Sequence, residues 1–145
     1  MNETITVETT VHAPIEKVWH DFTDAESVKA WNAASDDWHT TQSMNDLKTG
    51  GTFSYRMEAK DGSEGFDFKG TYDEVIPQER IAYAMEDGRK VIVVFTQTED
   101  AVHIVETFDP ESENSLDFQR AGWQAILDRF KQYSEQGMWV KKKPA

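Results

Sequence analysis

The side chains of this sequence that are best suited to ligand binding are large aromatic ones. Five of them lie on segments whose apolar faces are expected to point inward: Trp31, Tyr55, Phe68, Phe95 and Trp123. Tyrosine and tryptophan combine an apolar ring with one polar group, so they can hold a mostly apolar ligand and orient it. An ordinary aromatic core would use the same residues, and the sequence alone leaves that alternative open.

One segment, residues 102–108, carries two side chains capable of acid–base chemistry, His103 and Glu106. Their positions differ in parity, so a regular strand points only one of them inward. Each has apolar companions on its own face, and the sequence does not decide between them. An inward Glu106 is expected either to have a raised pKa, as a general acid or base would, or to pair with Arg56. We treat Arg56, His103 and Glu106 as candidate polar contacts of a ligand.

Other kinds of chemistry are excluded or unsupported. The chain has no cysteine, which rules out disulfides, a thiolate nucleophile and thiolate metal sites. Its four histidines show no H-E-x-x-H pattern and no pair four residues apart on a predicted helix. Neither a G-x-S-x-G motif nor a phosphate-binding glycine loop is present. We therefore expect no metal site, and we assign no catalytic residue.

Length and charge narrow the class of protein further. The 145 residues suit a single domain spanning 1–145. The 27 acidic residues against 15 basic ones give a net charge of -12, which argues against nucleic acid and against an anionic membrane surface as partners. The chain starts with acidic and polar residues rather than a signal peptide. We expect a cytoplasmic protein.

The pattern of apolar residues and turns predicts the elements that hold these side chains. Alternation and turn-forming residues favour strands at 4–11, 38–44, 52–59, 65–76, 80–86, 90–98 and 101–109. Asp61-Gly62 and Asp87-Gly88 are typical of tight hairpins, and connections this short make neighbouring strands antiparallel. The parity of 65–76 is irregular, which predicts a bulge near Gly70.

Helices are expected on either side of these strands. A short one begins near Pro14, and a capping-box pattern at Thr23-Asp24-Ala25-Glu26 starts a second. A long amphipathic helix follows at 114–136, with Gly137 as its C-terminal cap. The mid-helix Gly122 suggests that another group approaches the backbone there.

A sheet of about seven antiparallel strands can bury the apolar stripe of the long helix by curling around it. The two short helices between strands one and two then close one end. This is an α+β arrangement, and a cleft between sheet and helix is a usual site for an apolar ligand.

Several stretches in this order resemble the helix-grip superfamily of START domains and birch-pollen allergens. Within it, the likeness is to the branch named for activators of the heat-shock-chaperone ATPase (AHSA-type). The stretches are Ala13-Pro14-Ile15-Glu16-Lys17-Val18-Trp19, Thr23-Asp24 through Trp31, Asp46 through Phe53, Gly70 through Ile81, and Gly122-Trp123-Gln124-Ala125-Ile126-Leu127.

The resemblance implies an internal cavity, no obligatory metal or cofactor, and no motif for a particular activity. Three functions follow from it and from the residues. The first is binding of a hydrophobic or aromatic small molecule between the sheet and the long helix. The alternatives are a co-chaperone-like module that contacts a chaperone ATPase in the stress response, and an enzyme of the cyclase, dehydratase or hydrolase type that uses acid–base residues of the cavity. The sequence constrains neither the identity of the ligand nor the oligomeric state.

Overall fold

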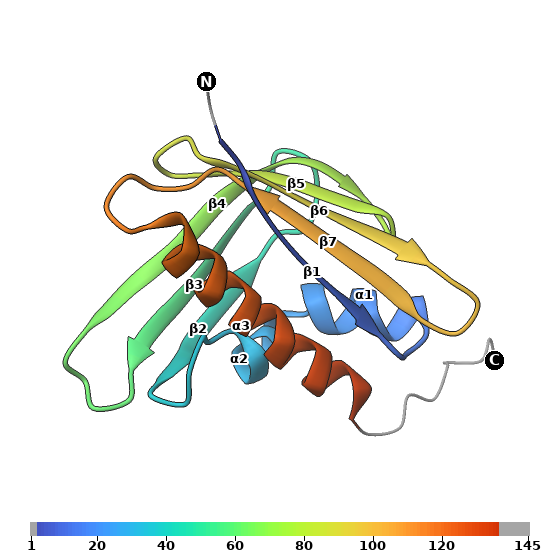
Figure 1. The fold of residues 1–145 in the computed structure, drawn as a ribbon, viewed down its shortest axis with the longest axis horizontal. Helices are drawn as coiled ribbons and strands as arrows, with labels where there is room; N and C mark the ends of the chain where they lie inside the picture. The colour runs from blue at the N-terminus through green and yellow to red at the C-terminus, as the bar shows by residue number, and fades with distance from the viewer. Residues whose placement is uncertain (1–2, 137–145) are drawn as a thin grey trace.

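The computed structural model describes residues 3–136, which form one seven-stranded sheet and three helices (Figure 1). The elements are β1 (Ile5–Val11), α1 (Ile15–Thr23), α2 (Ala25–Trp31), β2 (Trp38–Asn45), β3 (Thr52–Ala59), β4 (Gly65–Ile76), β5 (Arg80–Met85), β6 (Lys90–Gln97), β7 (Val102–Phe108) and α3 (Leu116–Glu135). The α+β class and the helix-grip arrangement predicted from the sequence are confirmed.

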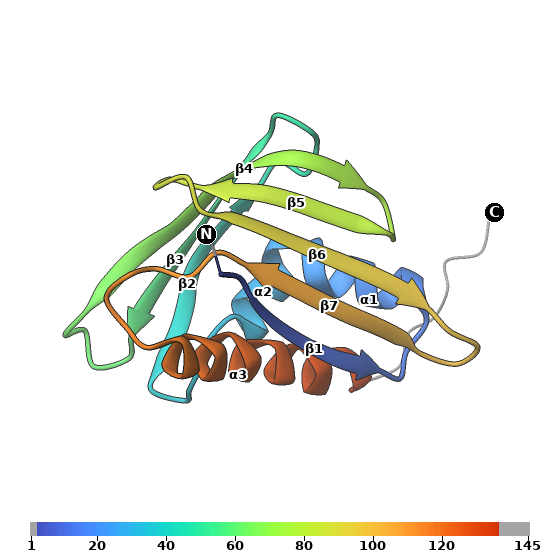
Figure 2. The same cartoon turned by 45° about the horizontal axis from the view of Figure 1, so that its top comes forward.

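The sheet is a meander of β2 to β7 that the first strand extends at the β7 edge. Its order is β1-β7-β6-β5-β4-β3-β2, and every neighbouring pair is antiparallel. Gly62 and Gly88 adopt the positive φ values, +79° and +91°, that the predicted hairpin turns require. Figures 1 and 2 show the bent sheet with α3 lying along its open side, while α1 and α2 carry the chain between the two edge strands.

The bulge predicted near Gly70 lies instead at Asp73, where the pairing of β4 with β5 shifts register. Even-numbered residues of β4 face inward up to Tyr72, and Val75 packs against the core beyond the bulge. Gly70 itself is paired regularly. A Cβ at Gly70 would come within 2.6 Å of the Phe53 ring, so this glycine makes room for a neighbouring aromatic side chain.

The predicted helix ends also need correction. Asp24, rather than Thr23, caps α2, and its carboxylate accepts a hydrogen bond of 3.0 Å from the Ser27 backbone N–H. The Thr23 hydroxyl instead donates to a carbonyl of α1. The predicted cap at Gly137 falls outside the described residues.

The space between the sheet and the helices is densely packed at the end nearest α1 and α2. We call this the packed end and define it by the rings of Phe22, Trp31, Phe95 and Phe130, whose neighbouring centroids lie between 5.0 and 5.4 Å apart. Phe130 is completely buried. Aromatic pairs at these separations add to the stabilisation that burial itself gives.

The buried side chains of Lys17, Asp21 and Ser134 at the packed end are partnered within the chain. The Lys17 ammonium lies 2.6 Å from the Asp21 carboxylate, which also accepts a hydrogen bond of 2.9 Å from the Ser134 hydroxyl. The Trp31 indole N–H donates to the Asp21 carbonyl at 2.9 Å. Charges and donors removed from water here therefore keep the partners that make burial tolerable.

Candidate ligand-binding cavity

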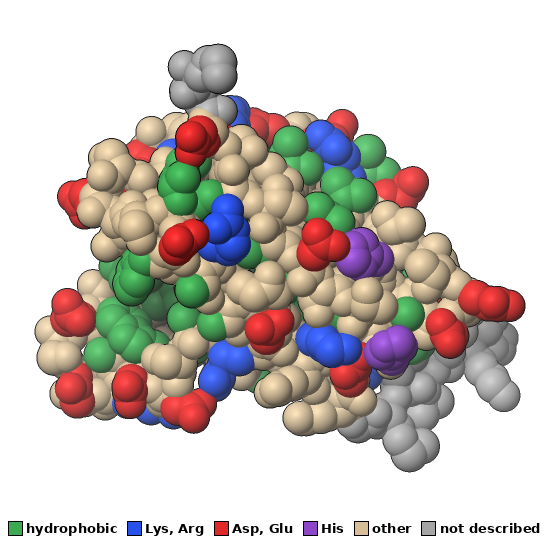
Figure 3. All heavy atoms as spheres, in the orientation of Figure 1, with side chains coloured by type: hydrophobic (Ala, Val, Ile, Leu, Met, Phe, Trp, Pro, Cys, Tyr) green, Lys and Arg blue, Asp and Glu red, His purple; other side chains and the backbone are tan. Residues whose placement is uncertain are grey.

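The other end of the space between sheet and α3 encloses a cavity, which we call the hollow end. Its volume is about 490 Å³, within the range of small-molecule sites. Side chains from β3, β4, β5 and α3 form most of its walls, with contributions from α1, the end of α2 and the loop that follows it, β2, and Glu106 of β7. Figure 3 shows hydrophobic side chains around a hollow near the start of α3. Phe66 and Phe118 line this cavity while remaining 47% and 67% exposed, so they lie at its mouth.

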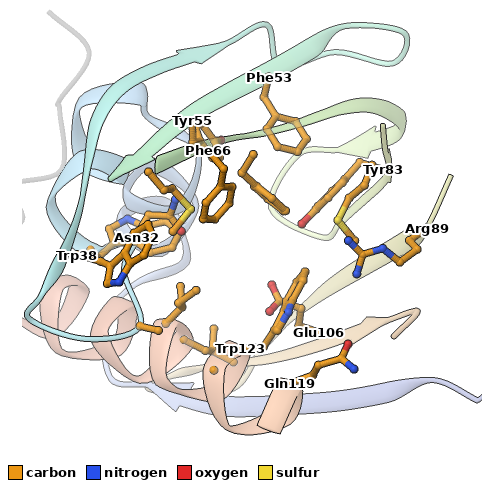
Figure 4. A pocket seen from close by; sticks show the side chains of 18 of the residues that line it. Asn32, Trp38, Phe53, Tyr55, Phe66, Tyr83, Arg89, Glu106, Gln119 and Trp123 are labelled. Carbon is orange, nitrogen blue, oxygen red and sulfur yellow. The ribbon is translucent and has the colours of Figure 1, made fainter. Parts of the chain in front are cut away.

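The cavity walls are mainly aromatic because alternate residues of two paired strands face the same way. Phe53 and Tyr55 on β3 lie with their ring centroids 5.0 Å apart, and Phe68 of β4 pairs with Tyr55 across the sheet. Trp123 of α3 stacks on Phe108 of β7 at 3.9 Å and faces Phe68 edge-on. These rings can hold a flat apolar molecule (Figure 4).

Glu106 is a buried carboxyl group in this apolar wall. Its nearest neighbours on the same face of the sheet are all apolar: Val7 and Val93 across the strands, and Ile104 and Phe108 along β7. Among residues 3–136, no group donates a hydrogen bond to its carboxyl group or forms an ion pair with it. Burial without a compensating partner raises the pKa of Glu106 to about 7.

Tyr83 places a second polar group at the same part of the cavity. Its hydroxyl points from β5 into the space that the Glu106 carboxyl also faces (Figure 4). Burial, together with the negative charge of Glu106, raises the pKa of Tyr83 well above its usual value. Within the described residues the Tyr83 hydroxyl makes no hydrogen bond, so it can donate to or accept from a ligand.

Five of the eight predicted site residues line the cavity: Tyr55, Phe68, Glu106, Trp123 and Trp31, of which Trp31 also belongs to the packed end and lies where the two ends meet. The structure thus places Glu106, and not His103, on the inner face of β7. Whether these five residues bind a ligand remains a prediction. Phe95 faces inward as well, but it lies at the packed end, where it contacts Trp19 edge-on at 5.3 Å.

Arg56 and His103 do not line the cavity, because both lie on the outer face of the sheet. Arg56 reaches the carboxylates of Glu58 and Asp67 at 3.1 and 3.5 Å, so it does not pair with Glu106. The ring of His103 lies 3.0 Å from a carboxylate oxygen of Glu8 and 2.9 Å from the hydroxyl of Thr10. The opposite parity of both residues to the inward ones explains this outcome.

Other lining residues were not predicted. Tyr83 has the same parity as Ile81 and Met85 on a predicted strand, and that alternation was a usable indication of its direction. Arg89 and Gln119 line the cavity through loop and helix geometry that periodicity does not reveal. Asn32 also lines it, and its side-chain nitrogen is buried without a partner.

The expectation that another group approaches Gly122 is wrong. A Cβ built at Gly122 would meet nothing within 4 Å, and this residue lines the cavity. The absence of a side chain here therefore leaves part of the cavity empty.

The arrangement can bind and orient an apolar molecule and can exchange a proton with it near neutral pH through Glu106. Within residues 3–136, no three His, Asp or Glu side chains come together as metal ligands. In the same stretch, no helix combines the length and the apolar character needed to cross a membrane.

Comparison with known proteins agrees with this architecture. Among solved structures, the AHSA1-like protein from Aeromonas hydrophila is 46% identical to this chain. The alignment covers 92% of each of the two chains, and the TM-score is 0.87. A protein from Cytophaga hutchinsonii is 52% identical over 91% of this chain and 92% of that one, with a TM-score of 0.80. A protein from Chromobacterium violaceum is only 19% identical, over 93% of this chain and 99% of that one, and its TM-score of 0.82 shows the shared fold alone.

The fold and cavity therefore define a helix-grip protein. Residues 12–135 match the family described as Activator of Hsp90 ATPase homolog 1-like protein, and the chain belongs to that family. No curated protein sequence matches it significantly.

Proposed function

We propose that this protein binds an apolar, aromatic small molecule in the cavity between β3, β4 and α3. The observation that carries this proposal is an open, aromatic-lined cavity of about 490 Å³ at one end of an otherwise densely packed core. Burying apolar ligand surface contributes about 25 cal/mol per Å², so a bicyclic aromatic molecule would gain several kcal/mol from this contact. One or two polar groups then suffice to orient it.

Native mass spectrometry of gently purified protein tests this proposal. We expect a discrete additional mass that is lost on denaturation. The variant Gly122→Met places a side chain in the cavity and should abolish that mass without unfolding the protein. Ala121→Met adds the same side chain at the neighbouring exposed position and should retain the ligand. Equal retention by both variants would show that the molecule binds elsewhere.

Contact with a chaperone ATPase is a second candidate, which the family description favours. The net charge of -12 makes an electrostatic interface the natural form of such a contact. A chaperone pull-down that succeeds at low salt and fails at high salt would support it. Gly122→Met should leave this interaction unchanged, which separates it from binding in the cavity.

A further inference from the structure

We infer that the cavity selects aromatic ligands whose polar end is a hydrogen-bond donor, such as a phenol O–H or an aryl N–H, and that Glu106 accepts this hydrogen bond. The inference rests on the proposed ligand-binding function and adds a chemical class to it. It depends on where Glu106 lies, on what surrounds it and on which charged groups of the cavity wall already have partners.

Glu106 is only 8% exposed, and the open space next to its carboxyl group is the cavity itself (Figure 4). A buried carboxylate has about four acceptor positions, and the described residues satisfy none of them. Leaving such a group unpaired costs more free energy than a hydrogen bond usually contributes. A ligand donor that reaches it recovers that cost, whereas a purely apolar ligand does not.

The other charged side chains of the cavity wall already have partners within the chain. The Arg89 guanidinium lies 2.7 Å from the Asp87 carboxylate. The Glu111 carboxylate accepts hydrogen bonds from the backbone of Glu113 and from the backbone and side chain of Asn114. The Glu111 carboxylate is therefore already occupied, and Arg89 is paired through its Nε, whereas Glu106 has no partner among the described residues.

The remaining titratable groups that line the cavity are phenols: Tyr55, Tyr72 and Tyr83. Burial raises the pKa of each of them, so all three are neutral near pH 7. The residues paired with Glu106 across the sheet, Val7 of β1 and Val93 of β6, add only apolar side chains. Glu106 is consequently the group whose charge changes in this cavity around neutral pH.

This arrangement also predicts the orientation of the ligand. The rings of Tyr55, Phe68 and Trp123 would hold its apolar part, with the donor directed toward β7. The Tyr83 hydroxyl can donate to the same polar atom if that atom is a phenol oxygen. A ligand carboxylate at this position would lie against the Glu106 charge in a poorly solvated space, so anionic ligands are disfavoured.

A set of matched naphthalene probes tests the inference. Naphthol and naphthylamine carry a donor, methoxynaphthalene carries an acceptor alone, and naphthoate carries a negative charge at the same ring position. Calorimetric titration at about pH 8 keeps Glu106 mostly ionised and both donor probes mostly neutral. We expect the donor probes to bind roughly 10- to 100-fold more tightly than methoxynaphthalene, the range for a hydrogen bond to a charged group. Naphthoate should bind most weakly.

Two variants assign the preference to Glu106. Glu106→Leu removes the acceptor in an already apolar environment and should bind all uncharged probes equally, whereas Glu106→Gln should retain part of the preference. His103→Gln changes the outer face of the same strand and should behave as the wild type. Equal binding of naphthol and methoxynaphthalene by the wild-type protein would overturn the inference and leave the proposed function intact. Failure of every probe, in the wild type as in Gly122→Met, would contradict both.

Discussion

The packed end and the hollow end of this molecule use the same kinds of residue in opposite ways. At the packed end, Phe95 and Phe130 fill the space between sheet and helices, and Phe22 and Trp31 pack against them while also bordering the cavity. At the hollow end, rings of equal size leave about 490 Å³ empty. Two inward positions of α3 show the cause most directly, because Phe130 fills its surroundings while Gly122 has nothing within 4 Å of where a side chain would begin.

The two ends also differ in how they treat buried charge. Asp21 at the packed end has Lys17 and Ser134 as partners within the chain. Glu106 at the hollow end has no partner among the described residues, and its pKa rises to about 7. The difference teaches that aromatic content alone does not distinguish a core from a binding site. A buried polar group without a partner does distinguish them, because an ordinary protein core rarely contains one.

The largest expected effect is on packing. Phe130→Ala should lower the free energy of unfolding by about 3–5 kcal/mol, since a fully buried ring leaves a cavity that its neighbours cannot fill. Phe68→Ala, at the wall of an existing cavity, should cost less than about half as much. Urea denaturation of both variants measures this difference. Similar losses would mean that the hollow end is as tightly packed as the other.

The next effect concerns the buried ion pair. Asp21→Ala leaves the Lys17 ammonium buried without its partner and should destabilise the protein by about 3 kcal/mol. Asp36→Ala breaks an exposed pair with Arg129 and should change stability little. Thermal unfolding of the two variants gives the comparison. A small loss for Asp21→Ala would show that water readily reaches the packed end.

Glu106 should make stability depend on pH in the opposite direction to a paired carboxylate. Its pKa rises from an ordinary 4.5 to about 7 on folding, so the native state binds the proton more tightly than the unfolded chain. Stability is therefore retained below about pH 4.5 and lost as the pH rises toward 7.

This loss amounts to roughly 3 kcal/mol by about pH 8, which Glu106→Gln should recover. Unfolding of both proteins at several pH values measures it. The two proteins should be equally stable near pH 4 and should separate with increasing pH, and parallel curves would show that Glu106 is solvated or paired.

The smallest effect is expected at Gly122. Gly122→Ala should stabilise α3 by about 0.5–1 kcal/mol, because alanine favours the helix and its methyl group meets no neighbour. Gly70→Ala should destabilise the protein, because its methyl group would collide with the Phe53 ring. Thermal unfolding checks both signs. Destabilisation by Gly122→Ala would mean that the wall at this point is closed.

Local sequence patterns were enough to predict most of the fold. The hairpin turns at Gly62 and Gly88 and the helical spacing of Leu127 and Phe130 each depend on residues close together in the chain. The predicted position of the β4 bulge was wrong, because the bulge arises at Asp73, where the pairing of β4 with β5 shifts register. A glycine that makes room for a ring, such as Gly70, has the same appearance in the sequence as one that bulges.

The candidate site was predictable in part. Arg56 follows Tyr55 directly in its strand, so its outward direction could be predicted from the sequence. The inward direction of Glu106 became clear only from its pairing with Val7 of β1 and Val93 of β6. Phe95 faces inward as expected, but its place along β6 brings it to the packed end. Depth within a core is a three-dimensional property, and alternation along one strand does not report it.

The pairing of β1 with β7 has a consequence for how this protein folds. The hydroxyls of Thr6 and Thr107 lie 3.2 Å apart although 101 residues separate them in the chain. During synthesis β1 must therefore wait, unpaired, until β7 has left the ribosome. Pairings of such long range close slowly because the intervening chain must first be ordered. The wall that buries Glu106 against Val7 is thus among the last parts to form, and a nascent chain has no cavity to offer a ligand until it is nearly complete.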